Sequence, residues 1–97
     1  MDDNQDWLEP RNLAEGLRLL MIRLRLSPAE FAERVGISLS SLRLYLRGTR
    51  LPSALVLWQV AVESAKGLRI PVDSVWVAMG QWLERELQAE SSSSRHA

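Results

Sequence analysis

The sequence predicts an all-α domain of five helices with an extended last helix, and three features of the chain support this. Apolar residues recur three or four positions apart in five successive segments. Serines that can cap a helix start precede three of these segments, and glycines that can end a helix follow three: Ser27, Ser38 and Ser53; Gly36, Gly48 and Gly67. The 97 residues suffice for one modest core.

Composition excludes several kinds of site. The chain has no cysteine, which removes disulfides, cysteine metal ligands and cysteine nucleophiles. Its one histidine, His96, lies next to the last residue, so neither a histidine metal cluster nor a Ser/His/Asp triad is expected. No glycine-rich phosphate loop and no inward pair of carboxylates is visible. We therefore expect no enzyme, no metal site and no cofactor, and no small-molecule ligand is evident.

The two ends of the chain differ from its middle. Residues 1–9 are acidic and predict a flexible arm, in which Trp7 is the candidate contact with the body. Residues 91–97 are rich in serine and predict a disordered tail, which leaves a domain over 10–90. The acidic start lacks the features of a signal peptide, and no window reaches the roughly 18 apolar residues of a membrane span. The expected location is cytoplasmic, without a membrane partner.

Charge is unevenly distributed although the formal net charge is zero. Residues 1–15 hold five acids and one base, a net of −4, whereas residues 16–50 hold seven arginines and two glutamates, a net of +5. The central excess favours a local basic face, the kind that binds nucleic acid. Neutrality of the whole chain argues against strong nonspecific binding to DNA.

The first predicted helix begins with Pro10 in its first turn and ends near Arg25. Its apolar stripe has the spacing of an amphipathic helix, with Leu13, Leu17, Leu20, Met21 and Leu24. Three of its arginines fall outside this stripe and are expected on a solvated face: Arg11, Arg18 and Arg25.

Two short helices follow, separated by a tight glycine turn. Ser27, Pro28 and Glu30 predict a capping box at the start of a helix over about 28–35, and Gly36 predicts its end. Ser38 predicts the cap of a second helix over about 39–47, which Gly48 ends. Two short helices joined in this way form a helix-turn-helix, whose second helix can enter the major groove of DNA.

The last two predicted helices are more apolar. The fourth, Ala54 to Lys66, is apolar nearly all round and must be buried on more than one side, with Gly67 ending it. The fifth runs from about Val72 to Ala89. Its heptad-like seam is broken by Glu86, and the seam fits either the core face of the helix or a contact between two copies. As the dimer interface we predict Trp76, Met79, Trp82 and Leu83.

These residues carry a resemblance. The span from about Leu17 to Trp76 resembles the Xre-type helix-turn-helix domains of phage repressors and many bacterial regulators. The matching positions are Phe31-Ala32, Gly36-Ile37-Ser38, Leu42, Tyr45, Gly48, Arg50, Pro52 and Ile70-Pro71-Val72-Asp73. The resemblance implies a five-helix, phage repressor-like fold and a DNA-binding transcription regulator, acting as a homodimer on double-stranded DNA with a two-fold symmetric site.

The resemblance also implies which residues contact DNA. By position, the candidates for base contact are Leu39, Ser40, Arg43 and Leu44, and those for phosphate contact are Ser27, Ser38, Arg47, Thr49 and Arg50. Helical spacing agrees, because it places two sets of residues on opposite faces: Ser40, Arg43, Leu44 and Arg47 on one, and Leu42, Tyr45 and Leu46 on the other. Arginine suits guanine or phosphate, and leucine suits a thymine methyl group.

Two pairs of residues depart from the family pattern. Leu39 and Leu44 stand where DNA-reading members often have polar residues, and three interpretations stay open: contact with DNA, contact with a protein partner, or packing on neighbouring elements. Met21 and Leu46 replace an arginine–glutamate pair that is frequent in the family, which changes stability rather than function. The alternative function is therefore a helix-turn-helix fold that binds a protein instead of a specific DNA sequence.

Overall fold

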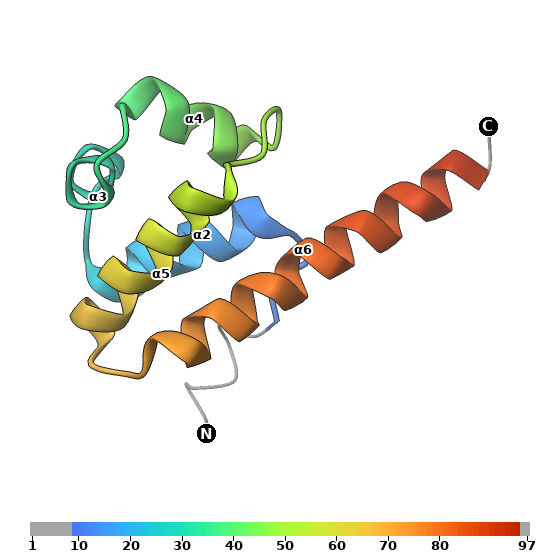
Figure 1. Cartoon of the computed structure of the whole chain (residues 1–97). Coiled ribbons are helices and arrows are strands. Elements are labelled where there is room, and N and C mark those ends of the chain that lie inside the picture. The colour runs from blue at the N-terminus through green and yellow to red at the C-terminus, as the bar shows by residue number, and fades with distance from the viewer. Residues whose placement is uncertain (1–8, 96–97) are drawn as a thin grey trace.

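The computed structural model describes the backbone of residues 9–95 and the side chains of residues 9–89. Of the predicted acidic arm, only Glu9 falls within this part; Trp7 and His96 lie outside it. The described residues form helices and no strands, which confirms the all-α class (Figure 1). The helices are α2 (Leu13–Leu24), α3 (Pro28–Val35), α4 (Leu39–Arg47), α5 (Ala54–Leu68) and α6 (Val72–Arg95).

Helix α2 begins later than predicted, because its start is capped from two directions. Asn12 Oδ1 accepts a hydrogen bond from the Glu15 amide at 2.9 Å. Glu86 Oε1, on α6, accepts one from the Leu13 amide at 3.1 Å. Pro10 is buried ahead of the helix instead of forming its first turn. Glu86, which breaks the apolar seam of α6, therefore serves as a cap for α2.

A second polar contact joins α6 to the start of α2. Arg85 Nη1 donates a hydrogen bond to the carbonyl oxygen of Pro10 at 2.7 Å. Together with the Glu86 contact, this bond holds the start of α2 against the middle of α6, 73 to 75 residues away in sequence. Beyond this point α6 continues away from the rest of the domain (Figure 1).

The core lies between the helices: α2 and α5 pack on α6 and on each other, while α3 packs on α4 and α5, and α4 packs on α2. Its largest fully buried side chains come from every helix and include Leu17, Phe31, Leu42, Val60 and Trp82. The Trp82 ring fits against Gly16 so closely that a Cβ at residue 16 would overlap it. Met21 and Leu46 are both buried, so the apolar pair predicted from their positions does pack inside the domain.

Burial changes the prediction for the dimer interface. Met79 and Trp82 are 1% and 0% exposed in the single chain. They form the core face of α6 with Val75 and Ala78, so a second copy cannot reach them, and they leave the predicted interface. Trp76 remains 41% exposed, and Leu83 is half-buried at the edge of the core.

The ends of α5 and α6 also differ from the prediction. Helix α5 passes through Gly67 and ends at Leu68, with Arg69 as the left-handed residue at φ 59°. Gly67 is needed for another reason: a Cβ there would overlap the side chain of Leu24 on α2. Helix α6 runs to Arg95, past the boundary at residue 90 that was predicted for the tail.

Candidate nucleic-acid interface

The first helix of the motif, α3, is fixed at its start by the predicted capping box. The Glu30 amide donates to Ser27 Oγ at 3.2 Å, and the Ser27 amide donates to Glu30 Oε1 at 2.8 Å. The pKa of the Glu30 carboxyl is lowered, chiefly by this hydrogen bond from the Ser27 main chain and then by the Ser27 hydroxyl. Arg34, one turn along, lowers it further. The carboxylate is thus held ionised at the positive end of the helix.

The turn between α3 and α4 has the geometry that its glycine predicts. Gly36 adopts φ 88°, and its amide bonds to the Ala32 carbonyl at 2.8 Å. The Ile37 amide bonds to the same carbonyl at 3.0 Å, and its side chain packs on the core. Ser38 Oγ then accepts from the Ser41 amide at 3.0 Å to start α4. These contacts set the angle between α3 and α4 within three residues.

Helix α4 has one anchored face and one free face. Leu42, Tyr45 and Leu46 are buried against the body of the domain. On the other face Ser40, Arg43 and Arg47 are exposed. Figure 1 shows α4 at the outer edge of the molecule, with α2 and α5 on its inner side. This arrangement presents arginines at two successive turns of an outward-facing helix that carries no acidic residue.

The loop after α4 is held in a compact turn. Gly48 adopts φ 75°, and both the amide and the hydroxyl of Thr49 donate to the Leu44 carbonyl, each at 3.1 Å. Arg50 follows and is exposed. Because both Thr49 donors are used within the chain, Thr49 places Arg50 rather than offering a hydrogen of its own.

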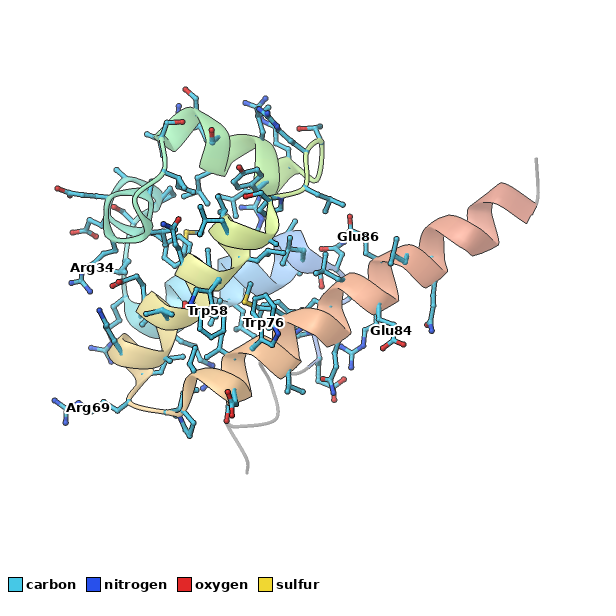
Figure 2. The ribbon with its side chains drawn as sticks, viewed as in Figure 1. Arg34, Trp58, Arg69, Trp76, Glu84 and Glu86 are labelled. Atoms are coloured by element: carbon cyan, nitrogen blue, oxygen red, sulfur yellow. The ribbon has the colours of Figure 1, made fainter. Side chains whose placement is uncertain are left out.

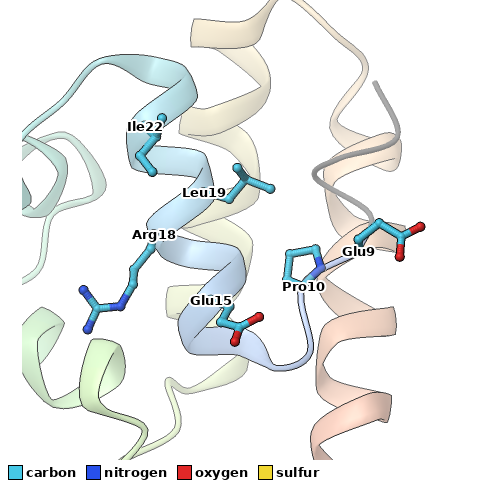
Figure 3. Close-up of a pocket in the computed structure, with 6 residues that line it drawn as sticks. All are labelled: Glu9, Pro10, Glu15, Arg18, Leu19 and Ile22. Atoms are coloured by element: carbon cyan, nitrogen blue, oxygen red, sulfur yellow. The ribbon is translucent and has the colours of Figure 1, made fainter. Parts of the chain in front are cut away.

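The C-terminal end of α4 is bonded by an arginine from another helix. Arg18 Nη2, on α2, donates to the carbonyl oxygen of Leu46 at 2.9 Å. Figure 3 shows the Arg18 side chain directed from α2 toward α4. Helical spacing predicts only a solvated face for Arg18. Its position beside the apolar stripe of α2 does not indicate the main-chain carbonyl, 28 residues away, to which it donates.

The structure brings together most of the predicted DNA contacts but changes the role of some. Ser40, Arg43, Arg47 and Arg50 are exposed along α4 and the loop after it, and Ser27 is exposed at the start of α3. Leu39 is half-buried and packs on the core, which favours the third of its three interpretations. Leu44 is half-buried beside the exposed face. The Ser38 hydroxyl donates to Ser41 Oγ at 2.9 Å, so it is also engaged within the chain.

Outside α4 and its loop, the described surface shows weaker candidates for a binding site. A shallow depression of about 360 Å³ beside α2 is open to solvent and is lined by Glu9, Pro10, Glu15, Arg18, Leu19 and Ile22 (Figure 3). The described side chains, those of residues 9–89, include no group of three histidine, cysteine or acidic residues placed to hold a metal ion. Within the same span, no helix has the length and apolar character needed to cross a bilayer.

Comparison with protein families identifies the arrangement of α3 and α4. Residues 17–62 match the family model described as Helix-turn-helix. Residues 17–62 thus form a helix-turn-helix domain of the Xre-like type. The match contains all of α3 and α4 and ends within α5, so α6 lies outside it. Searches of curated proteins and of solved structures found no match.

Xre-type helix-turn-helix domains are DNA-binding regulatory domains and are typically not enzymes. The family places DNA binding on the second helix of the motif, which in this chain is α4. The outward-facing arginines of α4 therefore lie on the helix that binds DNA in this family.

Proposed function

We propose that the protein is a transcription regulator that binds a short, two-fold symmetric DNA site, with α4 of each of two copies in the major groove. The observation that carries this proposal is the exposure of Ser40, Arg43 and Arg47 on one face of α4, while its opposite face is packed into the domain. A helix held rigidly from behind, with arginines in front, suits the major groove.

The exposed residues divide into two roles. Ser40 and Arg43 lie on the middle of the free face and contact base edges, with Arg43 pairing with guanine through its two parallel donors. Leu44 offers only a methyl contact, to thymine. Arg47 and Arg50, at the end of α4 and in the loop after it, contact phosphates and fix the register of the helix. Ser27 is a further phosphate contact at the start of α3.

The small size of this DNA-binding surface is the reason for proposing two copies of the protein on each site. One such domain makes few contacts, and helix-turn-helix proteins commonly gain affinity by binding two half-sites about one DNA turn apart. A homodimer with its two α4 helices on one side of the DNA meets this need.

The phosphate contacts are tested by the salt dependence of DNA binding. Fluorescence anisotropy of a labelled random-sequence duplex is measured over a range of salt for the wild type and for Arg47→Ala/Arg50→Ala. Each lost phosphate contact is expected to reduce the slope of log K against log salt by about 0.9. The control is Arg69→Asn, which removes an exposed arginine at the far end of α5 and tolerates the left-handed backbone there. Equal slopes for all three proteins contradict the proposal.

One observation favours a second function. Leu44 lies half-exposed among the arginines of α4, where a hydrogen-bonding side chain would read bases better. A helix-turn-helix fold that binds a protein through this face accounts for the leucine. Under that function Leu44→Ala weakens binding to the protein partner, and no duplex sequence is preferred.

A further inference from the structure

The depression beside α2 exposes apolar side chains that the described part of the chain leaves uncovered. Figure 3 shows Leu19 directed from α2 toward Pro10 across it. Ile22, which also lines it, is 70% exposed, more than any other large apolar side chain that the structure describes. A single exposed isoleucine is ordinary, but one in a depression beside Leu19 can pack against a further apolar side chain.

The N-terminal residues of the chain join the domain at this depression. Glu9, the first residue that the structure describes, lines it together with Pro10. Arg85 of α6 donates to the Pro10 carbonyl at 2.7 Å, which fixes the point where the preceding residues are attached. Consecutive Cα atoms are about 3.8 Å apart, so covalent geometry limits the Cα of Trp7 to within about 8 Å of the Cα of Glu9.

Residues 1–8 contain the kind of side chain that this depression fits. In their sequence, MDDNQDWL, Trp7 and Leu8 follow an acidic and polar stretch. A tryptophan buries about 150–250 Å² when it is covered. The volume of the depression, about 360 Å³, is near the lower end of the range for binding clefts, about 300 to 1,000 Å³. This size suits one aromatic side chain rather than a larger ligand.

The depression is next to the end of α4 that carries arginines. Arg18, another of its lining residues, donates to the Leu46 carbonyl in the last turn of α4 at 2.9 Å. Arg47 follows Leu46 directly, and Arg50 lies in the loop after the helix; both are exposed. A chain segment that packs in the depression therefore lies close to two of the proposed phosphate contacts.

The aspartates of residues 1–8 can reach that end of α4. From Trp7 to Asp2 an extended chain spans up to about 18 Å, whereas α2 is about 10 Å across. Helix α4 carries no acidic residue of its own. Opposite charges at such separations attract at low salt, because the Debye length is about 10 Å at 0.1 M.

We propose that residues 1–8 fold back over α2, that Trp7 packs in the depression, and that the aspartates ahead of it compete with DNA phosphates for Arg47 and Arg50. Nonspecific binding depends on phosphate contacts, whereas a specific site adds base contacts. The competition therefore weakens nonspecific binding in particular. It rests on the proposed function, because it needs DNA at α4; the contact of Trp7 with α2 does not.

The contact is tested without DNA, by NMR of the isoleucine methyl groups. The chain has three isoleucines: Ile22, Ile37 and Ile70. Trp7→Ala is expected to shift the Ile22 signal, because a tryptophan ring changes the magnetic field at a neighbouring methyl group, and to leave the other two in place. The matched control is Trp58→Ala, which should leave the Ile22 signal unchanged. Figure 2 shows the Trp58 ring directed toward Trp76 between α5 and α6, and neither ring lines the depression.

The competition is tested by fluorescence anisotropy with a labelled random-sequence duplex. Trp7→Ala, which keeps the charge, and Asp3→Asn/Asp6→Asn should both bind at least about fivefold more tightly than the wild type at low salt, and the gain should shrink at high salt. The control is Asp73→Asn/Glu84→Gln, which removes two exposed acids of α6 and raises the net charge equally. Its gain should stay below about twofold, since these acids lie outside the α4 surface.

Each outcome bears on a different part of the proposal. An Ile22 signal that Trp7→Ala leaves in place overturns the contact. So does a signal that moves with protein concentration instead, which indicates a second copy in the depression. If Ile22 responds but the variants of residues 1–8 bind DNA no more tightly than the control, the competition is overturned. If neither the wild type nor the variants bind any duplex, the proposed function fails and the competition with it, and the Ile22 signal still decides the contact.

Discussion

Arg18 and Leu46, on α2 and α4, are joined by a hydrogen bond of 2.9 Å from the guanidinium to a main-chain carbonyl. The carbonyl lies in the last turn of α4, where the helix has no partner of its own for it and where a positive charge is favourable. The bond fixes the end of α4 to the core helix α2. It thereby positions Arg47 and the loop that carries Arg50.

Arg18→Met keeps much of the aliphatic stem but removes this bond and its charge. We expect the free energy of unfolding to fall by about 1 kcal/mol, because a carbonyl at the helix end loses a charged donor. Arg11→Met is the control: the Arg11 side chain forms an exposed pair with Glu15 at 3.6 Å, and the loss of this pair should cost less than about 0.5 kcal/mol. Urea denaturation measures both. Equal effects would show that the Leu46 contact adds nothing beyond a surface charge.

Gly16→Ala tests the packing of α6 on α2. The added Cβ overlaps the ring of Trp82, which is fully buried, so the ring or the helix must shift. The expected loss is about 3 kcal/mol in the free energy of unfolding. Gly80→Ala, with nothing within 4 Å of its added Cβ, should instead gain up to about 1 kcal/mol from helix propensity. A tolerated Gly16→Ala would contradict the position of Trp82.

Ser64→Ala should stabilise the domain. The Ser64 hydroxyl is fully buried on α5, and among the described residues it has no hydrogen-bond partner. Removing it relieves the cost of a buried, unsatisfied polar group, about 1 kcal/mol. The same change at Ser53, whose Oγ caps α5 at 3.2 Å, should lower stability by about 1 kcal/mol. Thermal unfolding of the two variants should therefore shift in opposite directions.

Glu30→Gln tests the capping box through pH. The lowered pKa of Glu30 means that its ionised form is stabilised by folding, so its contribution is present above the ordinary carboxyl pKa. That contribution is lost as the pH falls through the lowered value in the folded state. Wild type should therefore be more stable than Glu30→Gln at pH 7, and the difference should vanish in acid. Glu33→Gln, exposed on the same helix, is the control; a pH-independent difference contradicts the account.

The helix-turn-helix was predictable from sequence because its signals are local. Ser27, Gly36, Ser38 and Gly48 act on residues within a turn or so of themselves, and the structure has all four where they were expected. The same local rules made Ser40, Arg43 and Arg47 one face of α4.

Other features depend on contacts that sequence spacing does not show. Local signals predict a helix end at Gly67, but the residue lies inside α5. Leu24 of another helix occupies the space that a Cβ at residue 67 would need, which explains the glycine. Glu86 looked like a break in a seam but caps α2, 73 residues away. Spacing alone leaves both interpretations of the α6 seam open, and only packing against Gly16 places Trp82 in the core.

The central claim is that the exposed face of α4 reads a DNA sequence, and selection from a pool of random duplexes at two salt concentrations tests it most directly. The account predicts that the full chain enriches one two-fold motif, that its affinity falls steeply with salt, and that Arg43→Ala relaxes the preference at one base pair of each half-site. No enriched motif, with Arg43→Ala/Arg47→Ala binding the pool as tightly as the wild type, would contradict it.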